Sequence, residues 1–146
     1  MHSDITIEIV DTIHLQKIRR FLRNIGNSAE TFRYFTNRPL SVIKNHIITL
    51  LALTEEKEPV GYGHLDKERD RVWLGICVAE LSRGQGIGKK LMQRLLAEAD
   101  RKQIPNIYLS VDQNNTFAIQ LYRNYGFSES EKKGDVCIFH RTFSKN

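Results

Sequence analysis

Residues 72–88 read VWLGICVAELSRGQGIG, and this stretch decides the fold. Its first part, Val72–Val78, is a nearly continuous apolar run, which is typical of a strand at the centre of a sheet. Three glycines then alternate at positions 84, 86 and 88. An amphipathic helix follows, because apolar residues recur at the spacing that places them on one helix face: Ile87, Leu91, Leu95 and Ala99, with Met92 and Leu96 beside them. We therefore expect a strand, a glycine-rich loop and a helix in succession.

The glycine-rich loop favours a phosphate ligand. Glycine lets the backbone approach a ligand closely, and the first turn of the helix offers unpaired N–H groups at the positive end of its dipole. A Walker loop is excluded, because its first glycine and its Ser or Thr would fall on Arg83 and Lys90. A dinucleotide fingerprint is excluded too, because its third glycine would fall on Lys89. A tight turn without a ligand explains the glycines by themselves equally well.

Hydrophobic periodicity predicts one mixed α/β domain over residues 1–146. We expect strands at 5–10, 47–54, 60–66, 72–78 and 106–111, and a hairpin over 127–143 that turns near 133–135. We expect helices at 15–25, from Ile87 onward and at 116–125, with a further short helix within 28–46, where Arg38-Pro39 forms a break. The strands at 47–54, 60–66 and 72–78 should form an antiparallel meander.

Composition limits the class of protein. Hydrophobic residues make up 40% and charged residues 27% of the 146, as in soluble globular proteins. The N-terminus lacks a basic start followed by an apolar core, and no apolar run reaches the roughly 20 residues that cross a bilayer. We therefore expect a cytoplasmic protein that does not enter membranes. The two cysteines, Cys77 and Cys137, lie in apolar stretches without metal-ligand spacing, so we expect buried reduced thiols and no metal site.

The net charge of +5 suits a polyanion of either kind, a nucleic acid or a small phosphorylated ligand. The basic residues are scattered along the chain and form no long run, and no aromatic-basic recognition motif accompanies them. We therefore expect no nucleic-acid partner. Composition alone does not choose among the small ligands.

Two motifs together resemble the GNAT superfamily of acyl-CoA-dependent N-acyltransferases. Arg83-Gly84-Gln85-Gly86-Ile87-Gly88 matches the signature Gln/Arg-x-x-Gly-x-Gly/Ala, five residues after a buried strand that ends at Val78. The second motif is N-x-x-A-x-x-L-Y-x-x-x-G-F, which Asn115–Phe127 matches without a gap. The order of expected elements agrees over essentially the whole chain and least in its N-terminal third. The resemblance implies a central twisted, mostly antiparallel sheet of about six to seven strands flanked by about four helices.

The resemblance also implies the activity and the site. It implies direct transfer of an acetyl group from acetyl-CoA to a primary amine in a ternary complex, by a monomer or a homodimer. The backbone around Val78 would hold the pantetheine arm and the thioester carbonyl, and Asn115 would contact the pantetheine. The backbone amides of residues 83–89 would cradle the pyrophosphate: Arg83, Gly84, Gln85, Gly86, Ile87, Gly88 and Lys89. Tyr122 would lie near the thioester sulfur, where its hydroxyl could donate a proton to the departing thiolate. A core aromatic packed beside Phe127 is the alternative for Tyr122. For Asn115 the alternative is an N-cap, and this residue could serve both roles.

The general base is the least determined part. Val72–Val78 contains neither an acid nor a histidine, whereas His64 and Asp66 share one face of the adjoining strand. His64 has the best intrinsic pKa for taking a proton near neutrality, so it is the candidate base; a structural histidine in the sheet is the alternative.

The acceptor amine should be bound by residues 28–46, which are rich in aromatic and basic groups: Phe32, Arg33, Tyr34, Phe35, Arg38, Lys44 and His46. A small polar amine, such as an amino sugar, is one expectation. A peptide or protein amine, and an acyl-CoA-binding module without turnover, are the alternatives. The same segment could instead be half core and half solvated surface.

Overall fold

The computed structural model describes residues 4–143, and its centre is a seven-stranded sheet with the order β1-β2-β3-β4-β5-β7-β6. The strands are β1 Thr6–Ile9, β2 His46–Leu53, β3 Pro59–Glu68, β4 Arg71–Val78, β5 Asn106–Asp112, β6 Ser128–Lys133 and β7 Val136–Thr142. Every neighbouring pair is antiparallel except β4 and β5. The predicted mixed α/β fold and the β2-β3-β4 meander are therefore confirmed.

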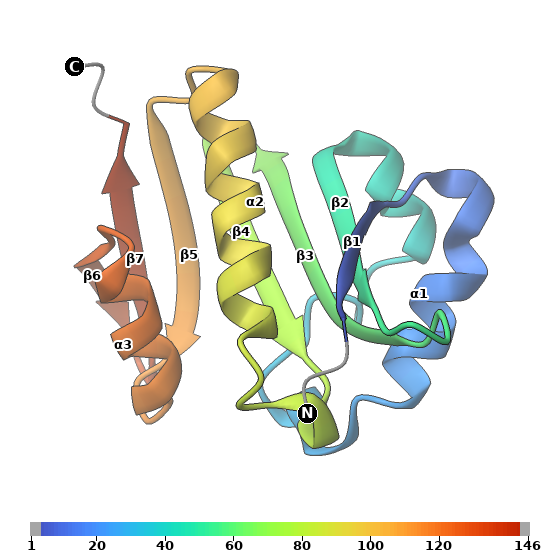
Figure 1. The fold of residues 1–146 in the computed structure, drawn as a ribbon. Coiled ribbons are helices and arrows are strands. Elements are labelled where there is room, and N and C mark those ends of the chain that lie inside the picture. Colours follow the sequence, from blue (N-terminus) through green and yellow to red (C-terminus); the bar gives the residue numbers. More distant parts are fainter. Residues whose placement is uncertain (1–3, 144–146) are drawn as a thin grey trace.

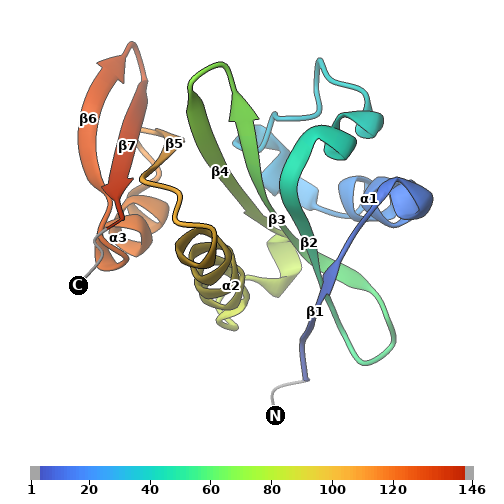
Figure 2. The same ribbon diagram turned by 90° about the horizontal axis from the view of Figure 1, so that it is seen from above.

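Helices cover both faces of the sheet (Figure 1, Figure 2). On one face, α2 (Ile87–Arg101) and α3 (Thr116–Asn124) bury an apolar cluster that includes Leu50, Leu91 and Leu109. On the other face, α1 (Leu15–Arg23) buries a second cluster that includes Phe21, Leu51 and Tyr62. The apolar stripe predicted for α2 is buried at every position: Ile87, Leu91, Met92, Leu95, Leu96 and Ala99.

The segment between α1 and β2 differs from the prediction. The expected short helix within 28–46 is replaced by two 3-10 turns, η2 (Gly26–Glu30) and η3 (Leu40–Asn45). Two further 3-10 turns are η1 (Thr12–His14) and η4 (Glu80–Ser82). Residues 28–46 lack a sustained apolar repeat, and Pro39 starts η3 from extended backbone, so no full α-helical turn propagates there.

The parallel pairing of β4 and β5 is short. It joins Val72 to Ile107 and Trp73 to Tyr108, and the ladder ends there. Figure 1 shows the two strands separating toward their carboxyl ends. Directly after β4 the amide of Ala79 donates to the carbonyl of Val60 in β3. Because backbone groups along a strand point alternately to either side, those of Ile76 and Val78 point away from β3. These peptide groups point into the place where β4 and β5 diverge.

Candidate functional site

The divergence of β4 and β5 lies beside the start of α2. Gly84 and Gly86 adopt φ values of +80° and +79°, the left-handed region that favours glycine, and a Cβ at either would meet nothing within 4 Å. Gly86 is the N-cap of α2 and supplies no capping side chain, so the first-turn N–H groups of a 15-residue helix face open space. Lys89 and Lys90 are exposed in that turn. This geometry suits the phosphates of a nucleotide-containing ligand.

Gly88 joins three elements of the site. A Cβ on Gly88 would lie 3.7 Å from Leu121 in α3 and 3.8 Å from Val78 in β4. The start of α2, the middle of α3 and the end of β4 therefore meet at this point. The structure thus brings together the glycine loop, Val78 and the helix that carries Tyr122.

Asn115 and Tyr122 occupy the two ends of α3. Asn115 is the N-cap, and its Oδ1 accepts a 3.2 Å hydrogen bond from the amide of Ala118, so the capping alternative holds. Tyr122 is buried and packs edge-on against Phe127, with the ring centroids 6.2 Å apart. Among residues 4–143 its hydroxyl has no hydrogen-bond partner. Burial, followed by the effect of the Cys77 thiol, raises the pKa of Tyr122 to about 12, so the hydroxyl keeps its proton at neutral pH.

Cys77 and Tyr122 lie in different apolar clusters, on opposite faces of the sheet. Cys77 packs in the α1-side cluster and Tyr122 in the α2-side cluster, yet the thiol contributes to the raised pKa of the tyrosine. Burial raises the pKa of Cys77 to about 12, so the thiol is protonated and a poor nucleophile. Cys77 and Cys137 are both free and buried, as the sequence predicted.

Arg83 points away from the glycine loop. Its Nη2 donates a 2.6 Å hydrogen bond to Ser28 Oγ, and that hydroxyl donates a 2.7 Å bond to the carbonyl of Val78. Glu80 reinforces the same junction, because its carboxylate accepts from the amide of Asn27 at 2.7 Å. Sequence reasoning missed Ser28, which gives no local signal because its partner lies 50 residues away.

His64 lies on the α1 side of β3, opposite Gly75 of β4. It is buried, its Nδ1 lies 2.6 Å from the hydroxyl of Tyr62, and a Cβ on Gly75 would stand 2.7 Å from its Nε2. Burial, with a smaller effect of His46 and Arg38, lowers the pKa of His64 well below its ordinary value. The expected histidine is therefore near β4, but this environment disfavours its taking a proton. The glycine within an apolar strand was the available sequence signal for such a close approach.

Most of the predicted acceptor residues are engaged within the chain. The hydroxyl of Tyr34 donates to Asp66 and contacts His46 Nε2, both at 2.7 Å. Arg38 pairs with Glu68 at 3.0 Å, and Arg33 pairs with Asp112 at 3.3 Å. Phe32 and Phe35 pack on Tyr62. Residues 31–38 therefore cover part of the α1 side of the sheet instead of lining an open basic pocket.

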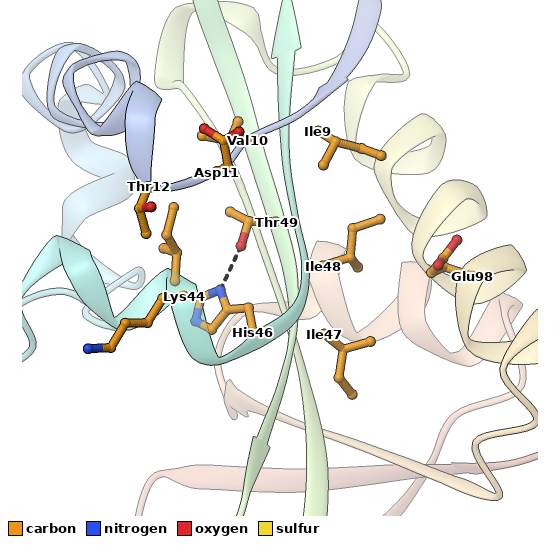
Figure 3. A pocket seen from close by; sticks show the side chains of 11 residues that line it. Ile9, Val10, Asp11, Thr12, Lys44, His46, Ile47, Ile48, Thr49 and Glu98 are labelled. Carbon is orange, nitrogen blue, oxygen red and sulfur yellow. Dashed lines mark hydrogen bonds between the residues drawn. The ribbon is translucent and has the colours of Figure 1, made fainter.

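A separate groove of about 430 Å³ lies at the edge of β2 (Figure 3). β1 pairs only with Leu50–Leu53, so the first half of β2 is left uncovered by β1. Figure 3 shows Ile47, Ile48 and Glu98 on one side of this strand and Lys44 and His46 on the other. Neither the glycine loop nor Tyr122 lines this groove, so it is distinct from the candidate site.

Among the described residues, no group of three or more His, Cys, Asp and Glu side chains is arranged to hold a metal ion. The helices of the described region also lack the length and apolar character that a membrane crossing requires.

Comparison with known proteins decides the family. The model of the acetyltransferase (GNAT) family matches residues 14–127. The chain belongs to the GNAT family. This GNAT chain is 39% identical over 64 residues to the spermine/spermidine N(1)-acetyltransferase of Bacillus subtilis (strain 168), a stretch that covers 42% of each chain. It is 36% identical over 78 residues to the peptidyl-lysine N-acetyltransferase YjaB of Salmonella typhimurium, covering 53% of this chain and 48% of the relative. The matches thus span less than half of either relative.

Solved structures agree in fold. The PaiA N-acetyltransferase from Thermoplasma acidophilum, solved with coenzyme A, superposes with a TM-score of 0.76 at 16% identity, covering 96% of this chain and 99% of that one. The GNAT domain of S. lividans PAT superposes with a TM-score of 0.81 at 13% identity, covering 94% and 89%. The predicted GNAT fold is therefore confirmed over nearly the whole GNAT chain.

Proposed function

We propose that the chain transfers the acetyl group of acetyl-CoA directly to a primary amine within a ternary complex. The observation that carries the proposal is the meeting of three features at one place. An uncapped helix start with two left-handed glycines lies beside the diverging strands β4 and β5, and Tyr122 is buried in the same apolar cluster as Ile87 and Val78. The helix start would bind the phosphates, the diverging strands would hold the extended arm of the cofactor, and Tyr122 would donate a proton.

Acetyl-CoA would be held mainly by backbone groups. The amides of residues 83–89 would cradle the pyrophosphate, with Gly84 and Gly86 leaving room for its oxygens. The pantetheine would lie along β4, where the peptide groups of Ile76 and Val78 point away from β3. The side-chain amide nitrogen of Asn115 makes no hydrogen bond within residues 4–143 and would be available to it at the start of α3.

In the reaction, the amine nitrogen bonds to the carbonyl carbon, the carbon–sulfur bond breaks, and the sulfur leaves with the bonding electron pair. Backbone N–H groups of β4 would stabilise the carbonyl oxygen as it gains charge. Tyr122 would donate its proton to the sulfur, the amine would lose a proton to solvent water, and the tyrosinate would regain a proton from solvent, so the proton count is unchanged. The amine has to arrive in its neutral form, because its lone pair forms the new bond.

The acceptor that we propose is a small primary amine, of which an amino sugar is one example. Residues 31–38 cover the α1 side through the contacts of Tyr34, Arg33 and Arg38, which favours a small molecule over a protein surface. The relatives named above act on a polyamine and on peptidyl-lysine, so these amines belong in the test.

Thiol release from acetyl-CoA tests the proposal. The purified chain is assayed with amino sugars, amino acids, polyamines and lysine peptides, and the mass of each product is measured by mass spectrometry. We expect one class to release thiol and gain a single acetyl group. Coenzyme A binding without thiol release across the panel would indicate an acyl-CoA-binding module instead. Failure to bind coenzyme A, with salt-dependent binding to DNA or RNA, would contradict the proposal entirely.

A further inference from the structure

His64 reaches across the neighbouring strand. β3 and β4 pair so that His64 lies opposite Gly75, and the ring occupies the space that a side chain at position 75 would fill. Its Nε2 stands 2.7 Å from the position of a Cβ on Gly75. The imidazole therefore places a nitrogen against β4, the strand that diverges from β5, although β4 itself contributes neither an acid nor a histidine between Val72 and Val78.

The hydrogen bond to Tyr62 decides which nitrogen carries the proton. The Tyr62 side chain is fully buried, and its hydroxyl has one partner among residues 4–143, His64 Nδ1 at 2.6 Å. If Nδ1 carried the proton, the hydroxyl hydrogen would be left buried without an acceptor, which is costly. If the hydroxyl donates to Nδ1, the proton lies on Nε2, which borders the half-buried Gly75. The second arrangement satisfies the more deeply buried group.

We propose that His64 is a neutral hydrogen-bond donor, held by Tyr62 with its proton on Nε2, that binds an oxygen atom of the substrates where β4 and β5 diverge. This inference rests on the proposed acetyl transfer and deepens it. The oxygen belongs either to the thioester carbonyl, which gains charge during transfer, or to a hydroxyl or carbonyl group near the amine of the acceptor. A donor Nε2–H cannot take the proton of the amine, so this role replaces that of a base.

The groups around His64 keep it neutral. The titratable and charged groups that face it come from β3, β2 and the 31–38 segment: Tyr62, Asp66, Glu68, His46, Tyr34 and Arg38. The carboxylate of Asp66 accepts a hydrogen bond from the hydroxyl of Tyr34 and makes no hydrogen bond to His64. Burial disfavours a positive charge on His64 most strongly, and His46 and Arg38 add to this effect, in agreement with the lowered pKa of His64.

Nitrogen NMR of the free chain measures the tautomer of His64 and needs no amine substrate. In the ¹⁵N-labelled chain, the His64 signals are assigned by their loss in His64→Gln. We expect a protonated Nε2 and an unprotonated Nδ1 that do not change between about pH 5 and pH 8. Tyr62→Phe should introduce the Nδ1–H tautomer. A proton on Nδ1 in the wild-type chain, or titration of the ring in this range, would overturn the proposal.

Two substitutions separate a donor from a base. The amide of Gln donates a hydrogen bond but cannot take a proton at neutral pH, and Leu does neither. We expect His64→Gln to keep at least about tenfold more activity than His64→Leu, the factor that one hydrogen bond supplies. Thermal unfolding of both variants, and His14→Gln at an exposed position as a control, account for effects on folding.

The pattern of loss identifies the oxygen. A lower kcat with every amine indicates the thioester carbonyl, whereas a higher KM confined to oxygen-bearing amines indicates the acceptor. An equal loss of activity in the two folded variants would contradict the proposal if the wild-type rate also rises with pH and this rise disappears in both variants. His64 would then act as a base. If the wild-type chain transfers no acetyl group at all, the proposed function fails, while the tautomer measured by NMR still tests the geometry.

Discussion

The hydroxyl of Ser28 donates a 2.7 Å hydrogen bond to the carbonyl oxygen of Val78 and accepts one from Arg83. This buried serine therefore ties the turn after α1 to both the end of β4 and the start of the glycine loop. Arg33 of the same segment pairs with Asp112 at the end of β5. The segment 28–33 is thus connected to β4 and to β5, the two strands on either side of the proposed position of the thioester.

Ser28→Ala should weaken this junction. It leaves the part-buried carbonyl of Val78 and the guanidinium of Arg83 without their partner, which costs about 1–3 kcal/mol in the free energy of unfolding. We also expect weaker coenzyme A binding, because Val78 and the loop lose a common support. Urea denaturation and calorimetric titration with coenzyme A measure the two effects. Ser41→Ala, on an exposed residue of η3, is the control and should change neither. Unchanged coenzyme A affinity in folded Ser28→Ala would refute the link.

Gly86→Ala should separate backbone strain from ligand binding. Gly86 has a φ of +79° with nothing near a Cβ, and Gly134 in the β6–β7 turn has a φ of +61° with equally open space. Alanine at either position should therefore cost a similar amount of stability, about 1–2 kcal/mol. Only Gly86→Ala should also lose coenzyme A affinity, by at least about tenfold, because its methyl group would enter the space proposed for the pyrophosphate. Equal coenzyme A affinities in the two variants would contradict that placement.

The fold could be predicted from the sequence where the signal is local. The apolar run at 72–78 and the stripe that begins at Ile87 are each set by the period of one element, and both elements form as expected. Residues 28–46 have no such period, so their 3-10 turns depend on contacts with α1 and β2 that no local pattern encodes. Tertiary packing decides the structure of this segment.

The candidate site divides in the same way. The glycine loop and Asn115–Phe127 are contiguous motifs, and their chemistry can be read from residue types. The position of His64 over Gly75 depends instead on the register between β3 and β4, and its low basicity depends on burial by Tyr34 and Tyr62. Neither the register nor the burial can be read from the intrinsic pKa of a histidine, and this intrinsic pKa is the property that made His64 the candidate base.

Tyr122→Phe should lower kcat and leave binding intact. The substitution removes a hydroxyl that has no hydrogen-bond partner among the described residues, so packing against Phe127 is preserved. Loss of a general acid lowers the rate by about 100-fold or more. Because the pKa of Tyr122 is raised to about 12, wild-type kcat should show no fall from ionisation of this residue up to about pH 10.

Tyr125→Phe is the matched control for Tyr122→Phe. The Tyr125 hydroxyl accepts a 3.2 Å bond from Gln93 at the surface and should have little effect on kcat. Steady-state kinetics and coenzyme A titration distinguish the two variants. If Tyr122→Phe keeps the wild-type kcat, the tyrosine is only a core aromatic.

Protonation of His46 should destabilise the fold in mild acid. Its side chain is fully buried, and burial, followed by the charge of Arg38, lowers its pKa from 6.5 to about 4. Between these two pH values the unfolded chain therefore binds more protons than the folded chain. The contribution of neutral His46 to the free energy of unfolding is thus complete above pH 6.5 and is lost as the pH falls toward 4. At about 1.4 kcal/mol per pH unit, this difference is worth about 3 kcal/mol.

His46→Gln removes the titrating group, although it also changes the contacts to Thr49 and Tyr34. The measurement is therefore the difference in unfolding free energy between wild type and variant, obtained by urea denaturation at several pH values. We expect the advantage of the wild type to shrink steadily between pH 6.5 and 4, and a constant difference would show that His46 is not held neutral by burial.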